Sequence, residues 1–140
     1  MTRRSPAGIG PHRRGGTGYA GRMLNHVALT VADRERSAAF YARHFGLTRR
    51  VVDDDHLLIV APPDGSCLLA LSHGTPPAAD LPRTNHFGFV ATDADAVRAA
   101  RERFRTDGVP ETEWQDDHGF VRCQVRDPDG YLVEIYQVPA

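Results

Sequence analysis

Hydrophobic and polar positions follow the same order twice along the chain. Residues 24–30 and 84–90 have the apolar content and alternation of a strand. After each of them, apolar side chains recur at positions i, i+3 and i+7, the spacing of one helix face. These side chains are Ala38, Tyr41 and Phe45 in the first half and Val97, Ala100 and Phe104 in the second. Each half is therefore predicted to start as a strand followed by a helix.

Residues with known preferences for helix ends bracket both predicted helices. Asp33 and Asp93 precede them, and an aspartate there accepts hydrogen bonds from the free amides of the first turn. Gly46 and Gly108 follow them, where a left-handed helix stop favours glycine. Short β-rich stretches and a Pro-Asp-Gly turn complete each half. The pattern predicts an α+β fold of paired βαβββ modules that form a curved, mostly antiparallel sheet with a cavity.

Length and composition favour a single domain. The chain has 140 residues, of which 41% are hydrophobic and 25% charged. We expect one domain over residues 23–140, with module one at about 23–73, a Pro-rich linker at 74–83 and module two at 84–138. Residues 1–22 are rich in Arg and Gly without apolar periodicity, and they are predicted to be a flexible extension.

Charge and residue usage exclude several functions. The chain has no lysine, which excludes Schiff-base catalysis and a P-loop. Cys67 and Cys123 are far apart and form no Cys-x-x-Cys motif. Outside the basic residues 1–22 the chain is acidic, which disfavours nucleic acid as a partner. The chain lacks an apolar run long enough to cross a membrane or to serve as a secretion signal, so we expect a cytoplasmic protein.

Three side chains are the candidates for chemistry. Strand alternation places His26 beside Ala28 and His86 beside Gly88, on faces turned away from the bulky neighbours that pack on the helices. Glu134 lies in the middle of an otherwise apolar last strand, where a carboxylate needs a cation or another partner. If the two modules form one curved sheet, His26, His86 and Glu134 meet and make a facial ligand set for a divalent ion. Fe²⁺ is favoured, and Mn²⁺, Ni²⁺, Co²⁺ or Zn²⁺ would also suit.

Several segments resemble the vicinal oxygen chelate superfamily, which includes glyoxalase I, extradiol dioxygenases, fosfomycin-resistance transferases and bleomycin-resistance proteins. The segments are Leu24-Asn25-His26-Val27-Ala28-Leu29, residues 37–47, Asn85-His86-Phe87-Gly88-Phe89 and Asp127-Pro128-Asp129-Gly130-Tyr131-Leu132-Val133-Glu134. The resemblance implies the paired-module fold, a divalent metal, a small-molecule substrate, and a homodimer whose site is often shared between two chains. It leaves the reaction open, because this scaffold carries many chemistries.

Further residues are expected around the metal. Alignment of the two turns places Leu69 opposite Glu134, where glyoxalase I has a fourth ligand, so a four-ligand isomerase is disfavoured. Arg122 and Gln124 alternate with apolar neighbours, so they are expected to face the cavity as substrate-binding residues, with a surface position open for Arg122. Leu69 is expected to contact the substrate as well. Trp114 is expected either to cover a ligand or to cap the core. His118 and Tyr136 are the first candidates for proton transfer.

The leading functional hypothesis is a metal-dependent enzyme that chelates vicinal oxygens of a small organic substrate, either phenolic or a natural product. Both a dioxygenase-like reaction and a lyase or isomerase reaction remain open. One alternative is an antibiotic-sequestering protein of the bleomycin-resistance kind without catalysis, and another is a cyclase of a biosynthetic cluster. The ligand triad favours the enzyme.

Overall fold

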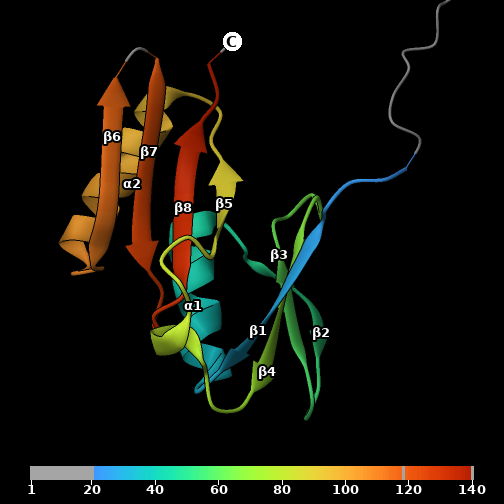
Figure 1. Ribbon diagram of the computed structural model, residues 1–140. Helices are drawn as coiled ribbons and strands as arrows, with labels where there is room; N and C mark the ends of the chain where they lie inside the picture. Colours follow the sequence, from blue (N-terminus) through green and yellow to red (C-terminus); the bar gives the residue numbers. More distant parts are fainter. Residues whose placement is uncertain (1–20, 118, 140) are drawn as a thin grey trace, which may run out of the picture.

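The computed structural model describes residues 21–117 and 119–139, and these form two modules with the same order of elements (Figure 1). Module one contains β1 (His26–Val31), α1 (Arg34–Phe45), β2 (Arg49–Asp53), β3 (Leu58–Ala61) and β4 (Leu68–His73). Module two contains β5 (His86–Val90), α2 (Ala94–Thr106), β6 (Glu111–Asp117), β7 (Phe120–Arg126) and β8 (Leu132–Gln137). A short 3₁₀ helix, η1 (Ala78–Asp80), lies in the linker. The predicted α+β fold with repeated βαβββ modules is confirmed. The predicted extension, residues 1–22, lies outside the described residues apart from its last two.

Each module has its own four-stranded sheet. The strand orders are β1-β4-β3-β2 and β5-β8-β7-β6, and the two sheets are not joined by hydrogen bonds among the described strands. The pairs β1–β4 and β5–β8 are parallel and the other pairs are antiparallel, so the sheets are mostly antiparallel, as predicted. Within the chain the two sheets do not join, because β1 and β5 are each an edge strand, so the condition for the predicted meeting of His26, His86 and Glu134 is not met in one chain.

The helix ends follow the sequence signals. The Asp33 carboxylate accepts a hydrogen bond from the Arg36 amide at 3.0 Å, and the Asp93 carboxylate accepts one from the Ala96 amide at 2.8 Å. Gly46 ends α1 with a φ of 71°, a left-handed conformation that costs glycine little. The two aspartates, which follow the ends of β1 and β5 by two and three residues, therefore fix the residue at which each helix begins.

Helix α1 lies between the two sheets and contacts both modules (Figure 1). Its Tyr41 is fully buried, and the Tyr41 ring stacks on Phe87 of β5. The Tyr41 hydroxyl donates a 2.8 Å hydrogen bond to Asp127, in the turn before β8. From the same turn, the Tyr131 hydroxyl donates to the Thr30 carbonyl at 2.8 Å. These contacts join module one to module two through one turn.

A second junction connects the two helices. His44 of α1 is only 4% exposed, and its imidazole Nε2 lies 3.0 Å from Asp107, the residue that ends α2. Arg43 pairs with the same carboxylate. The His44 ring packs between Phe40 and Phe104.

Apolar side chains are exposed beside the two edge strands. Met23 and Leu24, just before β1, are 82% and 89% exposed, and Val90 at the end of β5 is 65% exposed. Among the described residues, no helix has the length and hydropathy needed to span a membrane.

Candidate functional site

The polar face of the second sheet carries the strongest group of functional side chains. Parallel pairing of β5 with β8 sets Gly88 directly opposite Glu134, and His86 is two residues before Gly88 on the same face. The His86 imidazole Nε2 lies 3.8 Å from the Glu134 carboxylate. The Glu134 side chain is 13% exposed and that of His86 is 35% exposed. A histidine and a carboxylate are thus paired on a face with access to solvent.

A backbone contact orients the His86 ring. His86 Nδ1 lies 3.0 Å from the Thr84 carbonyl oxygen, which can only accept a hydrogen bond. The hydrogen in this contact must therefore belong to Nδ1. In the neutral ring, Nε2 then keeps its lone pair, and it is Nε2 that lies next to Glu134. Histidine ligands of metal ions are commonly held by such a bond from the other ring nitrogen.

The absence of a side chain at Gly88 makes room for Glu134. A Cβ atom at Gly88 would lie 2.8 Å from Glu134 Cγ and 3.2 Å from the Tyr136 ring. The side chains of Glu134 and Tyr136 therefore both pack directly against the Gly88 backbone of β5.

Arg122 of β7 is the cation next to Glu134. Its Nη1 donates to Glu134 at 3.2 Å, and its Nη2 donates to Glu113 of β6 at 2.5 Å. Arg83 also donates to Glu113 at 2.5 Å. The guanidinium groups of Arg83 and Arg122 hold the pKa of the Glu113 carboxyl below its usual range. The face thus contains two carboxylates joined by one arginine.

Gln124 and Tyr136, both predicted near the site, lie on the same face as Glu134. Gln124 is paired with Glu134 in the β7–β8 register and is buried. The Thr112 hydroxyl donates to the Gln124 side-chain oxygen at 2.8 Å. Tyr136 is paired with Arg122 in that register. Arg122, Gln124 and Tyr136 therefore surround the His86–Glu134 pair.

His26 is not brought to His86 and Glu134 within the chain. It lies on β1, the edge strand of the other sheet, opposite Leu68. No group of three His, Cys, Asp or Glu side chains arranged to hold a metal ion is found within residues 21–117 and 119–139. The expected meeting of the triad depended on one sheet that includes both modules, and each module instead forms its own sheet.

The structure also corrects the alignment of the two modules. Ala28 is opposite Ala70 in the β1–β4 register, just as Gly88 is opposite Glu134 in the β5–β8 register. The counterpart of Glu134 is therefore Ala70 and not Leu69. Leu69 is 2% exposed and belongs to the core, so it does not line the polar face. The connection from the turn to the strand is one residue longer in module one.

Two other predicted residues lie elsewhere. Trp114 is paired with the fully buried Cys123, and Arg101 of α2 stacks over its ring at 4.1 Å. Trp114 is therefore on the helix-covered face, opposite to Glu134, where it caps the core. His118 lies outside the described residues.

The donor set of module two fits part of a divalent-metal site. Two donors at ~2.1 Å from one ion are about 3 to 3.5 Å apart. The His86–Glu134 separation of 3.8 Å is longer than this, and a small side-chain movement would bring the two donors to one ion. One imidazole nitrogen and one carboxylate oxygen are also the donors that Fe²⁺, Mn²⁺ and related ions accept. The pair offers two ligands, and within the described residues no third His, Cys, Asp or Glu side chain completes the set.

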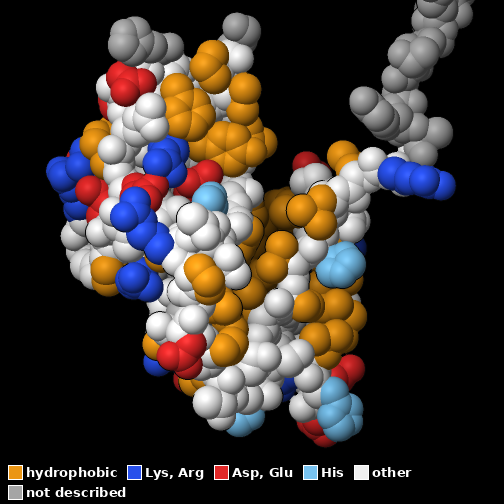
Figure 2. All heavy atoms as spheres, in the orientation of Figure 1, with side chains coloured by type: hydrophobic (Ala, Val, Ile, Leu, Met, Phe, Trp, Pro, Cys, Tyr) orange, Lys and Arg blue, Asp and Glu red, His pale blue; other side chains and the backbone are white. Residues whose placement is uncertain are grey.

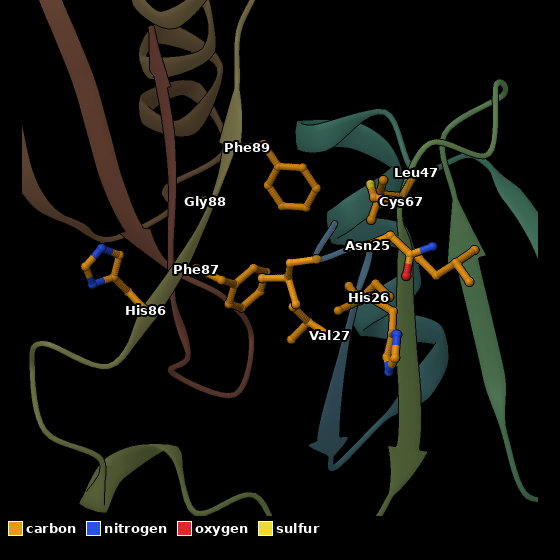
Figure 3. Close-up of a pocket in the computed structure, with 12 residues that line it drawn as sticks. Asn25, His26, Val27, Leu47, Cys67, His86, Phe87, Gly88 and Phe89 are labelled. Atoms are coloured by element: carbon orange, nitrogen blue, oxygen red, sulfur yellow. The ribbon is translucent and has the colours of Figure 1, made fainter. Parts of the chain in front are cut away.

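An apolar cavity of about 270 Å³ lies between the modules (Figure 2). Phe87 and Phe89 point into it from β5, while the His86 ring points away (Figure 3). Leu47 and the half-buried Cys67 line the other side. Burial raises the pKa of the Cys67 thiol, with Asp64 adding to the effect, so this thiol stays protonated at neutral pH. The residues that line the cavity also include His26 of β1 and His86 and Gly88 of β5, so it adjoins the His86–Glu134 face.

Glu113, Thr112 and Arg83 were not predicted from the sequence. Glu113 reaches the face because β6 has an irregular register between Glu111 and Glu113. Strand alternation alone does not reveal such a bulge. Arg83 comes from the linker, for which no pattern predicted a contact with the second sheet.

The two paired βαβββ modules, each with its own four-stranded sheet, define a class of small α+β proteins. The family model for the glyoxalase, bleomycin-resistance protein and dioxygenase superfamily matches residues 23–135, and the chain belongs to this superfamily. A comparison with curated proteins finds no match.

Three solved structures show the fold relationship. A lactoylglutathione lyase from Agrobacterium tumefaciens is 24% identical, with 82% of this chain and 92% of that chain covered and a TM-score of 0.65. A possible glyoxalase from Bacillus cereus is 26% identical, with coverage of 81% and 96% and a TM-score of 0.65. The fosfomycin-resistance protein FosX from Listeria monocytogenes is 18% identical, with coverage of 84% and 93% and a TM-score of 0.70.

Proposed function

We propose that this protein is a divalent-metal-dependent enzyme that binds a small organic substrate through two neighbouring oxygens. The observation that supports this most directly is the pairing of His86 with Glu134, together with the Nδ1 contact to Thr84 that leaves Nε2 free for an ion. When bound, a divalent ion supplies Lewis-acid stabilisation of negative charge on the chelated oxygens. Fe²⁺ remains the favoured ion, and an oxygenase and a lyase or isomerase remain the two candidate reactions.

The surrounding side chains have distinct proposed roles. Tyr136 lies on the same face as Glu134 and has a hydroxyl, so it is the proposed group for proton transfer to or from the substrate. Gln124, held by Thr112, offers its amide for substrate binding. Arg122 supplies positive charge next to Glu134.

The third ligand is proposed to come from a second copy of the chain. Among the described strands, β1 and β5 each pair on one side only, and exposed Leu24 and Val90 lie beside their other edges. Pairing of β5 with β1 of a second copy brings His26 of the partner subunit towards His86 and Glu134. A closed dimer of this kind contains two equivalent sites.

Metal stoichiometry tests the proposed function. Dialysed wild-type protein is expected to bind one divalent ion per chain, and His86→Ala and Glu134→Gln are each expected to lose most of this binding. His56→Ala is the matched control, because His56 is exposed in the turn between β2 and β3. Stoichiometric, unweakened binding by either site variant would contradict the proposal.

A further inference from the structure

Arg122 connects two carboxylates that do not contact one another in any other described way. Its Nη1 donates to Glu134 and its Nη2 to Glu113. All three side chains are partly buried, with exposed fractions of 26% for Arg122, 13% for Glu134 and 19% for Glu113. One guanidinium group therefore lies within hydrogen-bonding distance of both carboxylates.

The two ends of this bridge differ in the number of contacts that hold them. Arg122 Nη2 donates to Glu113, and Glu113 is held in place by Arg83 as well. The contact with Glu134 is 3.2 Å long. Arg122 Nε has a further, weak contact of 3.3 Å with Gln115 on the β6 side. The guanidinium is therefore anchored to β6, and its bond to Glu134 is the easier one to release.

Glu134 is approached from two sides. His86 lies on its Oε1 side at 3.8 Å, and Arg122 lies on its Oε2 side. A divalent ion next to His86 needs the charge of the same carboxylate that Arg122 neutralises. Since two cations beside one carboxylate repel each other, Arg122 and an ion compete for Glu134.

We propose that Arg122 is an exchangeable counter-ion of Glu134, released when a metal ion binds and then used to hold an anionic oxygen of the substrate. Glu113 and Gln115 keep the guanidinium in place, and the freed Nη1 faces the chelated substrate. This inference rests on the proposed function and deepens it. It assigns to the site substrates that carry negative charge on or beside the chelating oxygens, such as enolates, catecholates and 2-hydroxycarboxylates.

Two titrations of an Arg122 variant test this exchange, because its affinities for the metal and for the anion are expected to change in opposite directions. Co²⁺ serves as a spectroscopic metal probe, and oxalate serves as an anionic vicinal-oxygen probe for the Co²⁺-loaded protein. Arg122→Gln is expected to bind Co²⁺ roughly tenfold more tightly than wild type, because a competing charge is gone. The same variant is expected to bind oxalate roughly tenfold more weakly, because the anion has lost its partner.

Two further variants make the test specific. Arg101→Gln removes a similar arginine–carboxylate pair, with Glu111, from the helix side of the same sheet. It should leave both affinities unchanged. Arg122→Lys keeps the charge but loses the fork that reaches two carboxylates, and it should lie between wild type and Arg122→Gln in both titrations.

The outcomes separate this inference from the proposed function. A fall in both affinities in Arg122→Gln would mean that Arg122 only supports the structure, and it would overturn the exchange. Unchanged oxalate affinity would also overturn it. If Glu134→Gln binds Co²⁺ as well as wild type, the proposed metal site itself fails, whatever Arg122 does.

Discussion

Gly88 lies directly opposite Glu134 in the parallel β5–β8 pair, and Glu134 occupies the space that a side chain at Gly88 would fill. A Cβ there would lie 2.8 Å from Glu134 Cγ, closer than two carbon atoms can pack. The position of the candidate ligand thus depends on a missing methyl group on the neighbouring strand.

Gly88→Ala is expected to displace Glu134 and Tyr136 and so to weaken metal binding by about tenfold or more. The overpacking should also lower the free energy of unfolding by about 1–3 kcal/mol. Metal titration and thermal unfolding measure the two effects. Ala28→Gly is the matched control, since Ala28 is the module-one counterpart opposite Ala70. Unchanged metal affinity in Gly88→Ala would show that Glu134 is not a ligand.

Mixing two inactive variants tests whether the site is shared by two chains. His26→Ala and Glu134→Gln each remove one proposed ligand, and each homodimer should have no intact site. After unfolding and refolding together, half of the dimers are mixed and have one intact site of two. About a quarter of the wild-type metal binding should therefore return. If mixing restores nothing, the two ligands do not come from different chains.

Tyr41→Phe is expected to destabilise the junction between the modules. The Tyr41 hydroxyl bonds the Asp127 carboxylate at 2.8 Å, and burial raises the pKa of the Asp127 carboxyl. Loss of a buried hydrogen bond to a charged group costs about 1.5–3 kcal/mol. Denaturant unfolding measures this change. Tyr131→Phe removes a bond to the neutral Thr30 carbonyl and should cost less, about 0.5–1.5 kcal/mol. Equal costs would argue against a charged Asp127.

The burial of His44 is expected to make the free energy of unfolding depend on pH. Burial lowers the pKa of His44, an effect that Arg43 and Arg103 increase and that Asp107 opposes. The unfolded chain therefore binds a proton at higher pH than the folded one, and the free energy of unfolding falls as the pH drops below about 6.5. His44→Gln should lose this part of the pH dependence. Unfolding curves at pH 5 to 8 for both proteins measure the difference, and parallel pH profiles would contradict the assignment.

Local signals in the sequence predicted the modules well. Asp33, Asp93 and Gly46 act through bonds and dihedral angles within a few residues of their own position, and the structure confirms all three. The strand faces of His86 and Glu134 were also predicted correctly, because alternation within one strand needs no long-range information.

Features that depend on register or on the relation between modules were not predictable. The counterpart of Glu134 in module one is Ala70 and not Leu69. The connection before β4 is one residue longer than the one before β8, and such a difference changes which face of the strand each side chain occupies. The bulge that brings Glu113 to Arg122 has no clear signal in the sequence. The separation of His26 from His86 reflects how the modules pack, which no local pattern encodes.

The turn at Asp127–Tyr131 has a consequence beyond stability. It ties the start of α1 to module two, with Asp129 contacting Arg36 and Ser37 as well. These contacts hold module one against module two. In the proposed dimer, a small rotation of module one about this turn would move His26 relative to His86 of the partner subunit. Substitutions at the turn would then alter the affinity for an ion although no proposed ligand is changed.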